Sequence, residues 1–225
     1  MRTSWTLVAL PLLVACGSAP ARAPVATPAP SLRCLPAATG PTTDPADAEP
    51  AALRGQRARV VRNGATLLLR VRDTAVALTD QLGDSVPADE QVRYSFVAVR
   101  PELGLYEVAV LAWERSATLL VDVVTGHRTV TWAPPVPSPD GQRLAVASLD
   151  LEAGFNPNGL QVWRRGRDSL ELEWEVELTG WGPGPARWLD AGRFLVSRVP
   201  AADSGAGAGC VVVARGARGW RVTAP

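Results

Sequence analysis

Short apolar runs alternate with polar turns through most of residues 51–225. In the clearest stretch, the turn Ser138-Pro139-Asp140-Gly141 precedes the run Leu144–Ala147, and a polar loop separates this run from Leu160–Trp163. Proline presets φ at the second turn position and Asp-Gly closes the turn, so the flanking residues are expected to leave as paired strands. No segment keeps a helical apolar period long enough to compete. The pattern therefore predicts an all-β domain over 51–225.

Further strands are predicted before this stretch. Asn63-Gly64 separates Arg57–Arg62 from Ala65–Val71 and suits a type I′ hairpin turn. The other expected strands are Ala75–Leu78, Val92–Val99, Leu105–Trp113, Ala117–Asp122 and Arg128–Trp132.

Two patterns recur at spacings of about 40 to 50 residues. The pair Ala117–Asp122 and Arg128–Trp132, joined by a glycine turn, is echoed by Leu160–Arg165 with Leu170–Val176 and by Cys210–Arg215 with Trp220–Thr223. The Pro-Asp-Gly turn before Arg143–Val146 is echoed by Trp188–Gly192 before Arg193–Val196. Together these echoes predict antiparallel four-stranded units.

At these residues the chain resembles the repeats of TolB-like and WD40-like β-propellers, whose blades carry a Pro-Asp-Gly turn before a Leu-Ala-rich strand. Val136–Val176 carries the match, and the units from Val92 and Pro185 match in part. The resemblance implies a β-propeller-like fold with room for about four blades. A four-bladed ring, an open propeller fragment and a β-sandwich built from the same meanders all fit.

The N-terminus has the pattern of an export signal. Arg2 precedes the apolar run Trp5–Val14, which is too short to span a bilayer. The run ends in Leu13-Val14-Ala15-Cys16, which resembles the lipobox of bacterial lipoproteins. The resemblance implies that residues 1–15 are a signal peptide and that Cys16 is lipidated; the alternative is an ordinary cleavable signal.

Residues 16–50 are rich in proline and alanine and are expected to form a disordered tether. Several acyl chains on Cys16 would suffice for stable anchoring in the membrane. The lipoprotein resemblance, with Gly17 rather than aspartate after the cysteine, implies the outer membrane more than the inner one. The domain would then face the periplasm.

Cys34 and Cys210 would lie in an oxidising compartment, where an even pair of cysteines is usually bridged. We expect a Cys34–Cys210 disulfide, which would tie the end of the tether to the last part of the domain. The alternative is that Cys210, before three valines, is a small buried residue.

Composition limits the chemistry. The net charge of +1 gives no field that would recruit nucleic acid. His127 is the only histidine, so with bridged cysteines we expect no transition-metal site and no cofactor. A triad of Ser138, His127 and Asp122 lacks the surrounding nucleophile elbow and oxyanion loop.

Two loops are candidates for partner contact. Asp150, Glu152, Asn156 and Asn158 alternate oxygen-bearing side chains, a spacing suited to calcium as well as to a structural turn. Trp181 lies in a glycine-rich stretch, where we expect an exposed contact residue. The other tryptophans, including Trp113, are expected mostly to fill the core.

Four glutamates alternate with apolar residues along Leu170–Glu177, and period two places them on one strand face. This predicts either a solvated outer strand or an acidic stripe for a basic partner.

These patterns favour a non-catalytic, lipid-anchored cell-envelope protein that acts as a protein–protein interaction module. The alternatives are a ligand- or calcium-binding sensing lipoprotein and, third, a hydrolase. An unidentified envelope protein is the expected partner.

Overall fold

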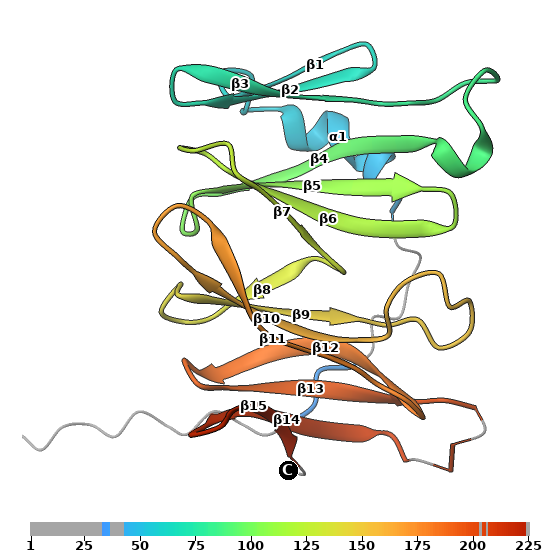
Figure 1. Ribbon diagram of the computed structural model, residues 1–225, viewed down its shortest axis with the longest axis vertical. Coiled ribbons are helices and arrows are strands. Elements are labelled where there is room, and N and C mark those ends of the chain that lie inside the picture. Colours follow the sequence, from blue (N-terminus) through green and yellow to red (C-terminus); the bar gives the residue numbers. More distant parts are fainter. Residues whose placement is uncertain (1–32, 37–42, 203, 206, 224–225) are drawn as a thin grey trace, which may run out of the picture. The chain divides into compact units, whose positions relative to one another are not determined.

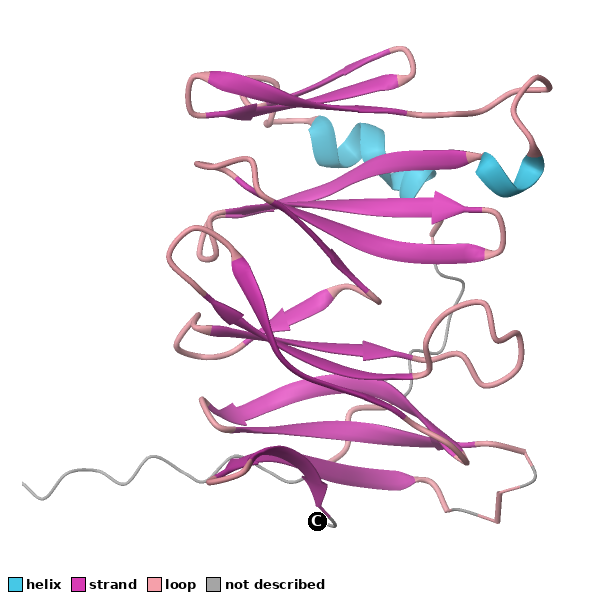
Figure 2. Cartoon of the chain, viewed as in Figure 1, coloured by secondary structure: helices cyan, strands magenta, loops and turns pink. Residues whose placement is uncertain are grey.

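The computed structural model describes residues 33–36, 43–202, 204–205 and 207–223, all within the unit spanning residues 31–225. Cys16 and the rest of the predicted signal peptide lie outside the described residues. Strands dominate the described chain, as Figure 2 shows, and the helices are α1 (Pro45–Leu53) and the 3-10 turn η1 (Ala88–Glu90). The predicted all-β class is confirmed.

The strands form four antiparallel sheets, which follow one another in chain order. The first sheet has three strands: β1 (Val60–Asn63), β2 (Thr66–Val71) and β3 (Thr74–Thr79). The second contains β4 (Val92–Arg100), β5 (Leu105–Ala112), β6 (Arg115–Asp122) and β7 (Arg128–Thr131).

The third sheet contains β8 (Pro135–Pro137), β9 (Arg143–Ser148), β10 (Gly159–Arg165) and β11 (Leu170–Glu177). The fourth contains β12 (Trp181–Asp190), β13 (Arg193–Pro200), β14 (Gly209–Gly216) and β15 (Gly219–Thr223). Each of these sheets is a four-strand meander, as the repeats predict.

The echoes in the sequence correspond to equivalent strands. The first pattern corresponds to the last two strands of the second, third and fourth sheets, namely β6–β7, β10–β11 and β14–β15. The second pattern corresponds to the first two strands of the third and fourth sheets, β8–β9 and β12–β13. The predicted turn Ser138–Gly141 forms with a Gly141 N–H to Ser138 carbonyl hydrogen bond of 2.9 Å and φ of 66° at Gly141. Glycine adopts this left-handed conformation without steric cost.

Each sheet packs on the next one in the chain. One buried cluster joins the first and second sheets through residues such as Leu69 and Tyr106. A second joins the third and fourth sheets through Val162, Trp188 and Trp220, and a smaller third joins the second and third sheets. None of these clusters of described residues joins the first sheet to the last, and Figure 1 shows the sheets following one another from β1–β3 to β12–β15. The arrangement is an open stack of propeller-like units.

The short helix α1 lies along the open edge of β4. Asp44 caps it by accepting the Ala46 N–H at 2.8 Å, and a proline follows at the first helical position. Glu49 accepts the Phe96 N–H of β4 at 2.7 Å and pairs with Arg62 at 2.8 Å. The boundary expected at residue 50 therefore falls inside a helix, and the folded region begins before residue 51.

The segment 33–36, which we call the N-terminal strap, packs on the fourth sheet. Cys34 and Cys210 form the predicted disulfide, with their Cα atoms 5.5 Å apart. Ser197 donates its hydroxyl to the Leu35 carbonyl at 2.5 Å. This part of the predicted tether is therefore bound to the domain rather than a free spacer.

No helix among the described residues is both long and apolar enough to cross a membrane.

Candidate functional site

Three hollows in the surface surround the β5–β6 hairpin of the second sheet. Their volumes are about 240, 300 and 490 Å³. They share residues of β5 and β6: Leu111 lines the first and third hollows, and Ser116 and Ala117 line the second and third. The hairpin thus lies at the centre of the three hollows.

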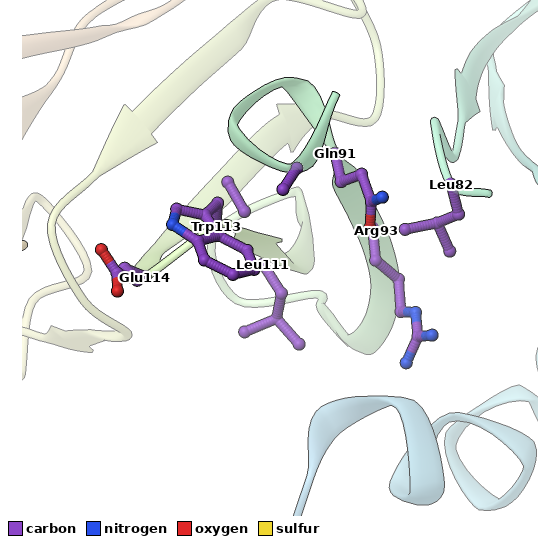
Figure 3. Close-up of a pocket in the computed structure, with 8 residues that line it drawn as sticks. Leu82, Gln91, Arg93, Leu111, Trp113 and Glu114 are labelled. Carbon is purple, nitrogen blue, oxygen red and sulfur yellow. The ribbon is translucent and has the colours of Figure 1, made fainter. Parts of the chain in front are cut away.

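The first hollow lies beside the hairpin turn. Trp113 and Glu114 form the two-residue turn between β5 and β6, since Ala112 pairs directly with Arg115. Trp113 is 55% exposed, although the sequence predicted a core position for most tryptophans. Figure 3 shows Trp113 and Leu111 on one side of the hollow and Leu82 on the other, with Gln91 and Arg93 between them.

Glu114 adopts φ of 57°, a left-handed conformation that is unusual for a residue other than glycine. Such a backbone holds a tight turn whose first residue, Trp113, projects into solvent. The turn leaves the large Trp113 ring at the surface, where an aromatic side chain can contribute strongly to a protein contact.

Trp132 separates the second and third hollows and lines both. The second is mainly apolar and includes Val130 and Phe155, which are 58% and 42% exposed. Leu149, at 49% exposure, lines the third. We call this set the Trp113–Trp132 surface; its apolar members are Leu82, Val110, Leu111, Trp113, Val130, Trp132, Leu149 and Phe155.

The loop that carries Leu149 and Phe155 contains most of the predicted contact residues. Asp150 accepts backbone N–H groups from Gly154 at 2.9 Å and from Asn156 at 2.7 Å. These hydrogen bonds, with Asn156 the larger contributor, hold the pKa of Asp150 below its usual range. Both carboxylate oxygens therefore shape the loop itself.

The two asparagines fix the loop to its surroundings. Asn156 accepts the Ser116 N–H at 2.9 Å, which joins the loop to the start of β6. Asn158 donates to the carbonyls of Leu178 and Trp181 at 2.8 and 3.0 Å. Glu152 is exposed. The structure thus gives Asp150, Asn156 and Asn158 supporting positions beneath an exposed Phe155.

Sequence reasoning did not select Trp113, Val130, Leu149 or Phe155. An available signal was the occurrence of the large apolar residues Leu149 and Phe155 in a connection between two strands, which is unusual without a contact to make.

Trp181 does not lie in a loop. It begins β12, is half-buried against the cluster between the third and fourth sheets, and has the Arg198 guanidinium carbon 5.5 Å from its ring centroid. The glycine beside it serves close packing: a Cβ on Gly182 would lie 2.2 Å from Leu149 Cδ1. The predicted glycine-rich loop is therefore a strand, and Trp181 is half-buried rather than fully exposed; its contact with a partner stays a prediction.

The glutamates of β11 do not form one stripe. The β10–β11 register shifts so that Val162 pairs with Trp174 and Trp163 with Leu172, which leaves Glu173 as an extra residue. Glu173 then faces the fourth sheet, where it accepts the Trp220 Nε1–H at 2.9 Å, while Glu175 accepts from Gln161. The bulge places the glutamates on both faces.

The residues of the conceivable triad have other partners. Ser138 donates its hydroxyl to Asp140 at 2.6 Å, and Asp122 accepts the N–H groups of Val124 and Thr125 at 2.8 Å. Burial acts to raise the pKa of Asp122, but these hydrogen bonds and Arg165 outweigh it and lower the pKa. His127 is exposed in the β6–β7 turn. The Ser138 and Asp122 side chains thus stabilise turns.

Within the described ranges, no group of three or more His, Cys, Asp or Glu side chains is placed to hold a metal ion. No protein-family model matches the chain, and no curated protein matches its sequence. What the site can do is therefore argued from its geometry. Exposed aromatic and aliphatic side chains lie on a tight hairpin and on a loop held by hydrogen bonds, an arrangement suited to burial against another macromolecule.

Proposed function

We propose that this chain is a non-catalytic, lipid-anchored cell-envelope protein that acts as a protein–protein interaction module through the Trp113–Trp132 surface. The exposure of Trp113, Val130, Leu149 and Phe155 around one hairpin carries the proposal. Soluble proteins rarely expose several large apolar side chains side by side unless the area is covered in use.

A protein partner suits this surface better than a small molecule. Small-molecule sites enclose most of the ligand and add a few converging polar groups. Here the hollows surround the β5–β6 hairpin without converging on one enclosed cavity, and the linings of the second and third are mainly apolar. Tryptophan, moreover, is among the residues that contribute most to binding at protein interfaces.

The anchoring part of the proposal rests on the sequence. The resemblance of Leu13–Cys16 to a lipobox supports lipidation at Cys16, and the disulfide Cys34–Cys210 agrees with an oxidising compartment such as the periplasm. Gly17 supports the outer membrane as the more suitable location.

Site-specific photo-crosslinking in the producing cell tests the contact. A photoreactive residue in place of Trp113 or Phe155 should give one discrete higher-mass adduct, and the same residue in place of Ala217, an exposed turn position on the fourth sheet, should not. Equal adducts at all three positions, or none at Trp113 and Phe155, would contradict the proposed interface.

A further inference from the structure

The outer face of the first sheet has no cover among the described residues. Val60 and Leu69 point into the core shared with the second sheet, so their neighbours Val61, Leu68 and Arg70 point outward. Val61 is 39% exposed and Arg70 is exposed, and both lie at the end of the stack.

The corresponding outer face of the fourth sheet is covered. Phe194 and Val196 point into the core shared with the third sheet, so Leu195 points outward, yet it is only 1% exposed. The N-terminal strap lies on this face through its bonds to Ser197 and Cys210. The first sheet is therefore the end of the stack that the described chain leaves open.

Charge distinguishes this open end. Residues 54–72 contain six arginines and no acidic residue, whereas the rest of the chain has 17 basic and 22 acidic residues. Arg62 is paired with Glu49 and Asp80. The other five are exposed and form no ion pair with the described carboxylates; they are Arg54, Arg57, Arg59, Arg70 and Arg72.

These arginines lie around the apolar centre of the outer face. Arg59 and Arg70 stand opposite each other, since the Arg70 N–H bonds to the Arg59 carbonyl at 2.8 Å. Arg54 and Arg57 line a hollow of about 390 Å³ together with Val61. The result is a sheet face with valine and leucine in the middle and arginine at its margin, a composition typical of protein interfaces.

We infer that the outer face of the first sheet is a second docking surface, which binds an acidic protein surface. The guanidinium fork pairs with carboxylates in two parallel hydrogen bonds, and the unpaired arginines here leave that capacity unused. The surface shares no lining residue with the Trp113–Trp132 surface. Binding at one of the two surfaces can therefore be absent while binding at the other is observed.

A second copy of the chain is a poorer occupant. Two copies that met through their first sheets would bring arginine against arginine. A copy that stacked its fourth sheet on the first would present Arg187, whose position in β12 alternates with the core-facing Ala186 and Trp188. Like charges placed opposite each other oppose both arrangements.

Binding of fluorescein-labelled poly-L-glutamate, measured by anisotropy at low salt on the full mature chain, tests the inference. The double reversal Arg59→Glu with Arg70→Glu should weaken binding about tenfold, since rim charges act through complementary fields. Arg54→Glu with Arg57→Glu should weaken it similarly. Each variant should unfold at the wild-type temperature, because none of these side chains has an ion pair to lose.

The matched control is Arg167→Glu with Arg218→Glu, two exposed turn arginines in the third and fourth sheets. It changes the net charge equally and should leave binding within about twofold of wild type, as expected for charges distant from the contact. An equal loss in this control would overturn the inference. So would the absence of saturable binding, or arginine-dependent binding to phosphatidylglycerol vesicles without binding to poly-L-glutamate.

Discussion

Glu173 occupies its position because of one irregularity in β11. Strict alternation would place it with Glu171, Glu175 and Glu177, but the bulge turns it toward the fourth sheet, where it meets Arg143 at 2.8 Å and Trp220. Sequence alternation predicts the strand correctly and cannot locate a bulge, because the extra residue depends on how the neighbouring strand is paired.

Glu173→Gln should lower the free energy of unfolding by about 1–2 kcal/mol at neutral pH, since charge-assisted bonds to Arg143 and Trp220 become neutral ones. Burial acts to raise the pKa of Glu173, but Arg143, Trp220 and Arg215 outweigh it and lower the pKa. Its stabilisation is therefore complete above the unfolded carboxyl pKa and is lost as pH falls through the lower folded value.

Urea unfolding at several pH values checks this expectation. The difference between wild type and Glu173→Gln should be largest near neutral pH and shrink in acid. Glu177→Gln, at an exposed position on the same strand, is the control and should change little. A difference that grew in acid would contradict the assigned sign.

The tryptophans separate into core and surface positions that their sequence context does not distinguish. Trp188 is 7% exposed and packs 5.9 Å from Trp220 and 5.0 Å from Phe194 between ring centroids, whereas Trp113 projects from a turn. Trp188→Ala should cost about 3–5 kcal/mol through the cavity it leaves. Trp113→Ala should stay within about 0.5 kcal/mol of wild type. Thermal unfolding of both variants measures this, and a comparable loss at Trp113 would place its ring in the core.

At the scale of elements, α1 is held by the hydrogen bonds and ion pair of Glu49 and by Ala52 and Leu53, which are partly buried against the core of the first two sheets. None of its residues is buried, which is why apolar periodicity gave no helix there. The Asp44-Pro45 pair, a cap followed by proline, was a usable start signal. The docking contact through Glu49, by contrast, depends on Arg62 and Phe96 from distant strands.

Glu49→Ala should destabilise the protein by about 2–3 kcal/mol, because it leaves Arg62 and the Phe96 N–H without their main acceptor in a largely buried setting. Asp47→Ala on the exposed side of the same helix is the control and should cost about 0.5 kcal/mol or less. Chemical denaturation of the two variants tests the contact. Equal effects would mean that α1 is not docked through Glu49.

The disulfide between the N-terminal strap and β14 closes a sequence separation of 176 residues. Cys34→Ser should lower the free energy of unfolding by about 5 kcal/mol on the chain-entropy model, since the unfolded chain loses a long-range constraint. Release of the strap should also expose Leu195 and increase hydrogen exchange in β13. Unchanged stability together with unchanged exchange would show that the strap adds nothing to the fourth sheet.

At the scale of the whole described unit, two large apolar clusters each join a pair of sheets, and the boundary between the second and third sheets is thinner. Its buried cluster consists of five leucines: Leu103, Leu105, Leu120, Leu144 and Leu170. Buried polar side chains, among them Gln161 with its bond to Trp132 N–H, share this boundary. The third hollow of the Trp113–Trp132 surface is lined from both of these sheets, so this part of the candidate interface lies beside the smallest of the three buried clusters.

Sequence reasoning predicted the strands, the repeat and the disulfide because each depends on local patterns or on compartment chemistry. It could not find the Trp113–Trp132 surface, which gathers residues from β5, β7 and the 149–158 loop through sheet packing. It also misassigned Trp181, since the crowding that requires Gly182 comes from Leu149, a residue distant in the sequence.

The proposed tethered envelope module depends first on the anchor at Cys16. Intact mass of the membrane-extracted protein should show a diacylglyceryl-plus-acyl increment, absent from a Cys16→Ala variant, and a gain of two hydrogens on reduction of Cys34–Cys210. A protein cleaved without any lipid would contradict the proposal and make the chain freely periplasmic.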